Sequence, residues 1–334
     1  MEIRKPAYYD AFRCLASACP DSCCKEWAVQ VDPESASLYR QLPDELGDQL
    51  RAVMVEEDGD TILKLTADRR CPMWRDDGLC RIQAQLGERA LCHTCRQFPR
   101  LQHDYGDFVE LGLELSCPEA ARLILCNNSD DLIETVPGGG TPEYDADAMA
   151  VLLKSREAAL SLLHSKQLSV GDTLAVLLVY GYAVQNELDD GDVAVLDPDK
   201  MLTAAKAMAA DGNLDGILDF YRSLEILTPQ WLQRLETAGV SFLDESLRPL
   251  VTYFINRYWL QAVSDYDLVG RVKLTVVSCL VIHALGGDLA ETAQLYSKEI
   301  ENDADNVDAI LDAAYTSPAL ADIGLLDLLL EECI

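Results

Sequence analysis

Residues 14 to 27 read Cys14-Leu-Ala-Ser-Ala-Cys19-Pro-Asp-Ser-Cys23-Cys24-Lys-Glu-Trp27. The sequence holds 12 cysteines among 334 residues, and ten of them lie between Cys14 and Cys126. The first six residues, Met1 to Pro6, lack the apolar run of a secretory signal. We therefore expect a cytoplasmic protein. Because disulfides are rare in a reducing cytoplasm, so dense a cluster of cysteines indicates a metal site.

A second set of cysteines follows after 46 residues, as Cys71-x8-Cys80, Cys92-x2-Cys95 and Cys117, and Cys126 is the tenth. Thiolates are soft ligands that favour zinc, copper(I) or iron–sulfur clusters over hard ions. The pair Cys92-x2-Cys95 fits a structural zinc site, and Cys19-x3-Cys23 could complete it. The spacing of Cys71 and Cys80 is less usual for zinc, whereas ligand spacings in iron–sulfur proteins are looser. From the spacing alone, zinc and iron–sulfur both stay open.

Charge excludes several classes of function. Lys and Arg total 27 against 57 Asp and Glu, a formal net charge of -30. Such a surface repels phosphate backbones, so we expect neither nucleic-acid binding nor docking on anionic membranes. The longest uncharged stretches, 173–186 and 274–287, are shorter than the roughly 20 residues of a membrane helix. The acidity suits a basic partner or substrate, or serves solubility alone.

A linker divides the chain. The stretch Val136-Pro-Gly-Gly-Gly-Thr-Pro142 cannot continue a helix or strand, and acidity is concentrated after it. Residues 1–126 carry a net charge of -7 and residues 127–334 one of -23. We therefore expect two domains, a cysteine-rich metal-binding domain at 1–136 and a second domain at 143–334.

The two parts differ in hydrophobic periodicity. In the first, alternating segments at 27–32, 61–66 and 108–115 predict short strands, and Asp32-Pro33 and Ser116-Cys117-Pro118 predict helix starts. In the second, helical spacing predicts helices at 144–164, 173–187, 198–210, 214–224, 229–238, 242–263, 268–285, 289–300 and 307–330, with a break near Pro318. The fold class is therefore α+β, a small α+β metal-binding domain followed by a mostly α-helical domain.

Four segments carry a resemblance to a known family. They are Tyr8-Tyr9-x2-Phe12-x-Cys14-x4-Cys19-x3-Cys23-Cys24-x2-Trp27, Gly78-Leu-Cys-Arg-Ile-Gln83 after Cys71, Cys95-Arg96-x-Phe98-Pro99-Arg100, and Leu115-Ser-Cys-Pro-Glu-Ala120. In this order they resemble the flagellin lysine-N-methylase family, part of a cysteine-rich group named for a CxxCxxCC signature and described as zinc- or iron-chelating. The helical part is similar only in general character.

The resemblance implies an enzyme, a flagellin lysine N-methyltransferase with a 4Fe–4S cluster and S-adenosylmethionine as methyl donor. It further implies that the shared cysteines are metal ligands: Cys14, Cys19, Cys23, Cys24, Cys71, Cys80, Cys95 and Cys117. Cys92 and Cys126 are additional in this sequence. Because eight thiols exceed the four that one cluster takes, either two metal sites exist or some thiols are structural. For a single cluster we favour Cys19, Cys23, Cys71 and Cys80, with Cys95 in reserve.

The methyl donor and the lysine acceptor each need residues that bind them. No Gly-x-Gly-x-x-Gly turn follows a strand, so the donor must be held differently from a Rossmann-type enzyme. Arg96 and Arg100 are our candidates for binding its carboxylate, or alternatively for offsetting thiolate charge. For the lysine, we consider the following residues near the cysteines, each with an alternative role in a turn, a cap or the core: Asp21, Asp32, Asp76, Asp77, Glu119, Trp27 and Trp74. His93 and His103 could replace a thiolate.

No catalytic residue is assigned from the sequence. The alternative function is a structural zinc- or iron-binding module whose helical domain binds a protein partner. The two hypotheses differ in whether the protein binds S-adenosylmethionine.

Overall fold

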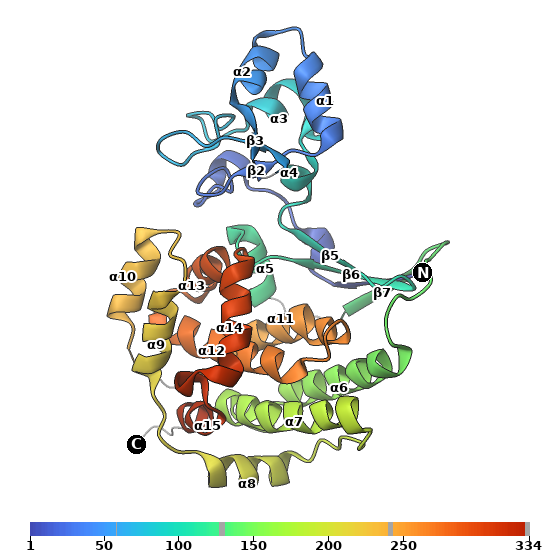
Figure 1. Ribbon diagram of the computed structural model, residues 1–334, viewed down its shortest axis with the longest axis vertical. Coiled ribbons are helices and arrows are strands. Elements are labelled where there is room, and N and C mark those ends of the chain that lie inside the picture. The colour runs from blue at the N-terminus through green and yellow to red at the C-terminus, as the bar shows by residue number, and fades with distance from the viewer. Residues whose placement is uncertain (58, 127–130, 240–242, 331–334) are drawn as a thin grey trace.

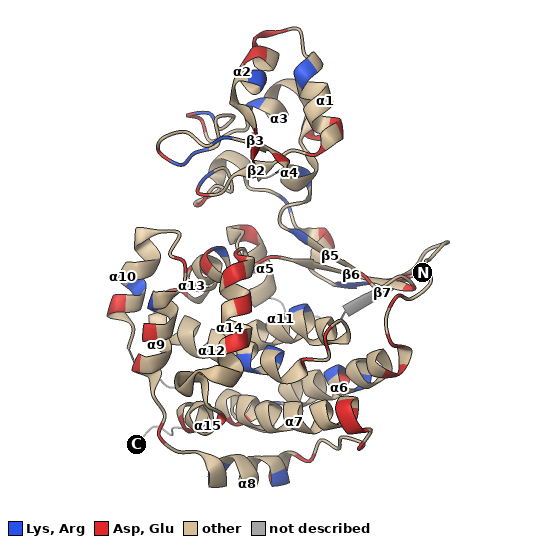
Figure 2. Cartoon of the chain, in the orientation of Figure 1, with Lys and Arg blue, Asp and Glu red and all other residues tan. Residues whose placement is uncertain are grey.

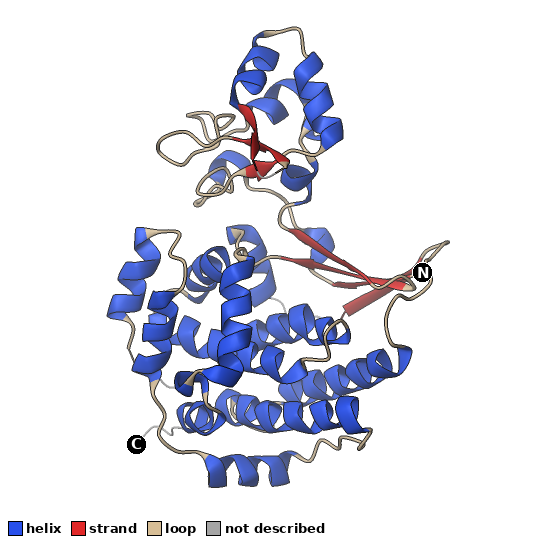
Figure 3. Ribbon diagram, viewed as in Figure 1, coloured by secondary structure: helices blue, strands red, loops and turns tan. Residues whose placement is uncertain are grey.

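The structure is a computed structural model of the chain, and it describes all residues except 58, 127–130, 240–242 and 331–334. Figure 1 shows a small lobe at one end, a large helical body at the other, and a sheet between them. We call residues 14–98 the cysteine lobe and residues 146–330 the helical body. Figure 3 shows that strands are confined to the lobe and the connecting sheet. The prediction of an α+β region followed by a mostly helical one is therefore confirmed.

The cysteine lobe is built on a three-stranded antiparallel sheet. Its order is β2-β4-β3, with β2 (Val29–Gln30) pairing with β4 (Asp60–Leu63) and β4 pairing with β3 (Met54–Glu57). Its helices are α1 (Pro33–Gln41), α2 (Glu45–Val53), α3 (Arg81–Leu86) and α4 (His93–Gln97). The Asp32 side chain accepts a hydrogen bond from the Ser35 amide and Pro33 occupies the first turn, so α1 begins where the sequence predicts.

A second, four-stranded sheet joins the lobe to the helical body. Its order is β5-β6-β1-β7, formed by β5 (Arg100–Asp104), β6 (Phe108–Leu113), β1 (Glu2–Pro6) and β7 (Asp131–Thr135). Strand β1 runs parallel to β6, with Glu2 opposite Phe108, and the other neighbours are antiparallel. Since β1 precedes the cysteine lobe and β5 follows it, the lobe is an insertion between strands of one sheet. Helix α5 (Pro118–Cys126) follows β6.

The helical body contains ten α-helices among the described residues. They are α6 (Ala146–Ser165), α7 (Val170–Asp190), α8 (Pro198–Met208), α9 (Leu214–Ser223), α10 (Pro229–Thr237), α11 (Arg248–Tyr258), α12 (Leu268–Leu285), α13 (Leu289–Tyr296), α14 (Ala304–Thr316) and α15 (Asp322–Leu330). Short 3-10 segments lie at Tyr9–Ala11, Ala16–Ala18, Glu88–Ala90, Glu245–Leu247, Trp259–Val263 and Pro318–Leu320, and a π turn at Ser297–Glu301. Most of these helices begin and end within a few residues of the predicted bounds.

One predicted helix needs correction. The helix expected at 242–263 begins at Arg248, becomes a 3-10 segment at Trp259, and has its predicted first residue, Phe242, outside the described residues. Pro249 lies in the first turn of α11, where the amide hydrogen that proline lacks would have no partner within the helix. The helical periodicity thus located the segment, and the proline decided its start.

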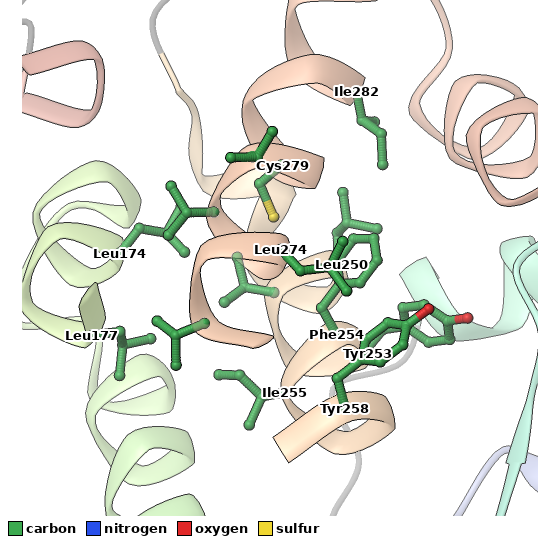
Figure 4. Close-up of a cluster of buried hydrophobic side chains, with 14 of the residues drawn as sticks. Leu174, Leu177, Leu250, Tyr253, Phe254, Ile255, Tyr258, Leu274, Cys279 and Ile282 are labelled. Carbon is green, nitrogen blue, oxygen red and sulfur yellow. The ribbon is translucent and has the colours of Figure 1, made fainter. Parts of the chain in front are cut away.

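Helix α12 is the centre of the large core. Its side chains pack against α7, α11 and α14, and Figure 4 shows Leu274, Cys279 and Ile282 of α12 facing α7 and α11 side chains. By length and composition α12 is apolar enough to cross a membrane, but 94% of it is buried inside the protein. Such burial is that of a core helix.

Two separate clusters of buried side chains stabilise the molecule. One belongs to the cysteine lobe and includes Leu50, Leu63 and Cys71. The other fills the helical body and also takes in residues of the connecting segment, among them Phe108 and Leu115. The connecting sheet and α5 therefore share their core with the helices. The division of the chain into domains at residues 137–142 stays a prediction.

Candidate functional site

Six cysteines of the lobe line one enclosed apolar cavity. The cavity measures about 30 Å³, and its cysteines are Cys23, Cys24, Cys71, Cys80, Cys92 and Cys95. The other walls are hydrophobic side chains, including Trp27, Met73 and Phe98. The folding of the lobe thus brings three distant segments of sequence, 23–24, 71–80 and 92–95, to one place.

Hydrogen bonds between thiols set the electrostatics of this cavity. A bond from Cys23 lowers the pKa of Cys24 to about 7, and a bond from Cys95 lowers the pKa of Cys92 to about 7. Burial raises the pKa of Cys71 to about 12. Desolvation makes several thiolates at once unfavourable, so a set of buried thiols like this is stabilised by a positively charged partner.

A second, smaller group of thiols adjoins the first. Burial, together with the nearby thiols of Cys19 and Cys14, raises the pKa of Cys117 to about 11. The pKa of Cys23 is raised by its bond to Cys24, by burial, and also by Cys14 and Cys117, so the two groups meet at Cys23. The predicted ligands therefore fall into two sets on either side of Cys23–Cys24.

The eight predicted ligands and the cavity differ at four positions. Cys14, Cys19 and Cys117 are not among the side chains described as lining the cavity, whereas Cys92, which the resemblance omits, is one of them. The Cys92-x2-Cys95 spacing was the signal that pointed to Cys92. As the side chains stand, no three His, Cys, Asp or Glu groups among the described residues converge closely enough to hold a metal ion.

A larger cleft of about 490 Å³ opens between the cysteine lobe and the helical body. The lobe contributes one wall, with Cys23, Trp27 and Phe98, and those three side chains also line the cysteine cavity. The opposite wall comes from the α13–α14 region and from the end of β6. Its polar side chains are Glu114, Ser116, Lys298, Glu299, Glu301, Asn302 and Asp303. The cleft and the cysteine cavity therefore share part of their lining.

Polar contacts across the cleft hold the lobe against the helices. The Lys298 Nζ atom lies 3.0 Å from Asp21 Oδ2 and 2.6 Å from Glu26 Oε2. Gln294 Nε2 donates to the same Asp21 oxygen at 2.8 Å. Burial alone would raise the pKa of Asp21, but hydrogen bonds from Lys25 and Lys298 hold it below its usual value. Asp21 and Glu26 are therefore occupied by a lysine of this same chain.

Two other carboxyl groups of the cleft have the opposite electrostatics. Burial raises the pKa of Glu114, against the opposing charge of Arg257, and Ser116 Oγ donates to its Oε2 atom at 3.1 Å. Burial also raises the pKa of Glu299, whose carboxylate accepts from Thr228 and from the Leu227 amide. A carboxylate with a raised pKa accepts a proton more readily near neutral pH.

Of the other candidate residues chosen in the sequence analysis, some line the cleft and others do not. Of the two arginines, Arg100 lines the cleft, with its guanidinium 5.2 Å from the Phe12 ring centre. Arg96 is not among the described lining residues and contacts the Arg89 carbonyl at 3.5 Å. Trp27 lies at the cleft.

The remaining candidates have structural partners. The Arg70 guanidinium stacks on Trp74, 3.9 Å from its ring centre. Asp32 caps α1 and accepts from the His93 amide, Asp77 pairs with Arg75, and Glu119 pairs with Arg122 at 2.7 Å. Asp76 is outside the described lining of the cleft, and the His103 side chain lines a different cavity, between the sheet and the helices. The sequence analysis did not predict Glu114 and Glu299 as site residues, because no local sequence pattern distinguishes them from other glutamates.

Comparison with known proteins identifies relatives. The chain is 35% identical over 134 residues to the flagellar biosynthetic protein FliU of Salmonella muenchen, covering 37% of this chain and 76% of that protein. It is 36% identical over 129 residues to proteins named lysine-N-methylase from Salmonella typhimurium and Salmonella choleraesuis. There the alignment covers 37% of this chain and 32% of each methylase, so the chain spans about a third of their length.

No family model matches the sequence, and no solved structure matches the fold. The coverage of the flagellar relative, at more than 30% identity, shows common descent over most of that protein. The chain belongs to the flagellin lysine-N-methylase family.

Proposed function

We propose that this protein is a protein-lysine N-methyltransferase that moves methyl groups from S-adenosylmethionine to lysine side chains of flagellin. Support comes from the two relatives named lysine-N-methylase and from the flagellar relative. The proposal places the enzyme in the cytoplasm, with flagellin as its partner and with no role for nucleic acid or membrane.

The observation that carries the proposal is that the cleft and the cysteine cavity share a wall. Cys23, Trp27 and Phe98 line both spaces. A group held by the thiols would therefore lie against anything bound in the cleft. A purely structural metal site would not need an adjoining cleft of this size.

The lining of the cysteine cavity fits a 4Fe–4S cluster by its chemistry. Its donors are thiols, and neither histidine nor carboxylate appears among its described lining residues, a set that suits iron–sulfur or zinc rather than hard ions. We propose Cys24, Cys71, Cys80, Cys92 and Cys95 as the residues from which its ligands come, with Cys14, Cys19, Cys23 and Cys117 available to a second site. When bound, such a cluster would supply an iron that can hold the amino and carboxylate groups of the donor.

The cleft residues perform the remaining tasks. Arg100 is the cation that would hold the donor carboxylate, and Trp27 offers a ring face to a cationic group. Glu301 and Asp303 bring negative charge that attracts the lysine ammonium. Glu114 would take the proton from that ammonium onto its carboxylate. The neutral nitrogen then attacks the methyl carbon, and the carbon–sulfur bond breaks with its electron pair going to sulfur.

Substitution of Glu114 tests this assignment. We expect Glu114→Gln to lower the rate of flagellin methylation by about 100-fold, the usual contribution of a general base, while donor binding persists. Glu119→Gln is the matched control, since Glu119 pairs with Arg122 on α5 outside the cleft, and it should leave the rate unchanged. Equal rates in both variants would remove Glu114 from the mechanism.

Metal analysis tests the cofactor and separates the alternative function. After anaerobic purification, we expect a brown protein with about four irons and matching sulfide per chain, and an electronic spectrum that changes when S-adenosylmethionine is added. A colourless protein that holds zinc and ignores the donor would refute the methyltransferase and support a structural metal module.

A further inference from the structure

A cavity far from the cysteines lies between the four-stranded sheet and the helices. It measures about 60 Å³ and opens between the face of β5, β6 and β1 that carries His103 and Glu110, and helices α6 and α11. Its lining includes Tyr8 and Tyr253 beside Asn256 of α11. A cavity of that volume exceeds the roughly 10–15 Å³ that a single water needs.

The charge of this cavity is opposite to that of the protein. Its lining holds four cationic side chains, Arg4, Lys5, Arg156 and Arg257, and a single carboxylate, Glu110, among the described residues. The whole chain has a net charge of -30. Figure 2 shows basic positions on α6, on α11 and in the sheet, while acidic positions lie along α14. Concentrated positive charge in so acidic a protein indicates a site for an anion.

All four of these cations have carboxylate partners, and Arg257 pairs with Glu301. Arg156 pairs with Glu110 through two contacts of 2.9 and 2.5 Å. Lys5 lies 2.7 Å from both Asp10 and Glu134, and Arg4 lies 2.9 Å from Glu2. The fourth cation, Arg257, differs from the others because one of its nitrogen donors has no hydrogen-bond partner among the described residues.

Arg257 and His103 each carry a buried nitrogen that lacks a partner. Arg257 Nε donates to Glu301 at 3.0 Å, but its Nη1 atom makes no hydrogen bond to any residue that the structure describes. The Nε2 atom of His103 is likewise buried without a partner in the described part of the chain. A buried polar nitrogen left unsatisfied costs about 1–3 kcal/mol, so two beside one cavity point to a ligand that satisfies both, with His103 donating from its Nε2–H tautomer.

We propose that this cavity binds a small oxyanion, a carboxylate or phosphate group, held by Arg257 Nη1 and His103 Nε2. An oxyanion presents several acceptor oxygens, and a charged acceptor gives hydrogen bonds about twice as strong as a neutral one. The His103 ring faces the charges of Arg257 and Glu110 and reports on the cavity directly.

The site also communicates with the cleft through one ion pair. Arg257 lines the anion cavity and Glu301 lines the cleft, and the two are 3.0 Å apart at Nε and Oε1. Tyr258 and Tyr253 also donate to Glu301, at 2.9 and 3.1 Å. A bound anion would thus hold the arginine that positions a cleft carboxylate. The binding site itself does not depend on the proposed methyltransferase activity.

Histidine NMR of the full-length protein tests the proposal, because the chain has only 4 histidines. Inorganic phosphate and acetate are titrated separately at constant ionic strength made up with chloride, and the His103 signal is assigned by its loss in His103→Gln. We expect a saturable shift of that signal alone, complete below about 10 mM of the preferred anion. Saturation by phosphate alone identifies a phosphate site, and saturation by acetate alone identifies a carboxylate site.

Three variants complete the test. Arg257→Gln removes the charge, and Asn256→Leu fills the cavity wall without touching the Glu301 pair; we expect each to weaken the anion at least about tenfold. Arg122→Gln, on the exposed face of α5, is the matched control and should bind as the wild type does. If the His103 signal follows ionic strength alone, or if Asn256→Leu binds with unchanged affinity, the proposal is wrong.

Discussion

The two buried cores of this molecule differ in the number and the kind of side chains that fill them. The core of the helical body is closed by aliphatic and aromatic side chains from many helices, with Trp231, Tyr221, Tyr296 and Phe254 wholly buried. The core of the cysteine lobe has far fewer buried side chains, and cysteines surround the cavity at its edge. Figure 1 shows short helices and loops in the cysteine lobe, and longer helices packed around α12 in the helical body.

This difference indicates that the two regions are stabilised in different ways. A large apolar core gains more from burial, relative to the entropy lost on folding, than a small one does, so the small core of the lobe has less surplus stability. All the lobe's cysteines are free thiols in the structure. We therefore infer that a bound metal group completes the lobe, and that the helical body folds without one.

Removal of the metal should produce the largest effect. We expect stripping with a chelator to destabilise the cysteine lobe by on the order of 10 kcal/mol, as for structural metal sites. The amides of β2, β4 and α1 should then exchange rapidly with solvent, whereas those of α12 keep their protection. Hydrogen exchange by mass spectrometry measures both at once. Equal loss of protection in the lobe and in α12 would show that the two cores are one unit.

Matched core substitutions should separate the two regions with a smaller effect. Phe254 is wholly buried, with its ring centre 5.3 Å from that of Tyr253 and 6.2 Å from that of Tyr296, and Figure 4 places it between α11 and α12. We expect Phe254→Ala to cost about 3–5 kcal/mol of the unfolding free energy of the helical body while metal content stays unchanged.

The lobe counterpart is Leu50→Ala, since Leu50 is also wholly buried. It should cost about 2–5 kcal/mol and lower the metal content with little effect on the helices. Urea unfolding followed by circular dichroism, with iron analysis, distinguishes the two. The comparison fails if Phe254→Ala also loses the metal in its folded state.

The contact between the regions should give the smallest effect. We expect Lys298→Gln to make the free energy of the contact between the lobe and the helical body less favourable by about 1–3 kcal/mol. The substitution removes charged hydrogen bonds to Asp21 and Glu26. Limited proteolysis of the folded protein should become faster. Lys200→Gln, which removes an exposed pair with Asp197, should digest like the wild type.

The same contact predicts a dependence on pH. The folded pKa of Asp21 lies below its unfolded value, so its stabilising contribution is present above about pH 4 and is lost as the pH falls through the folded pKa. The difference between wild type and Lys298→Gln should therefore shrink toward zero in acid. A difference that persists at the lowest pH would mean that Lys298 acts by packing rather than by charge.

Local sequence signals determined much of this protein. The cap at Asp32-Pro33, the breaks near Pro318 and in the Pro-Gly-rich stretch, and the periodicity of α7 and α12 gave the helices, because each depends on residues close in the chain. The cysteine spacing likewise indicated a soft-metal site in the first 126 residues. Arg100 and Trp27, chosen on the resemblance and on their nearness to the cysteines, both line the cleft beside the cysteine cavity, and their roles stay predictions.

Contacts between residues that are distant in the sequence became visible only in the tertiary structure. Glu114, Lys298 and Asp21 come from three distant segments, and their shared cleft exists because the lobe is inserted between β1 and β5 and folds back onto α13. Arg257 and His103 are likewise joined only by the packing of α11 on the sheet. Caps and periodicities follow from interactions between near neighbours, whereas burial, ion pairs and pKa values depend on groups that only the folded chain brings together.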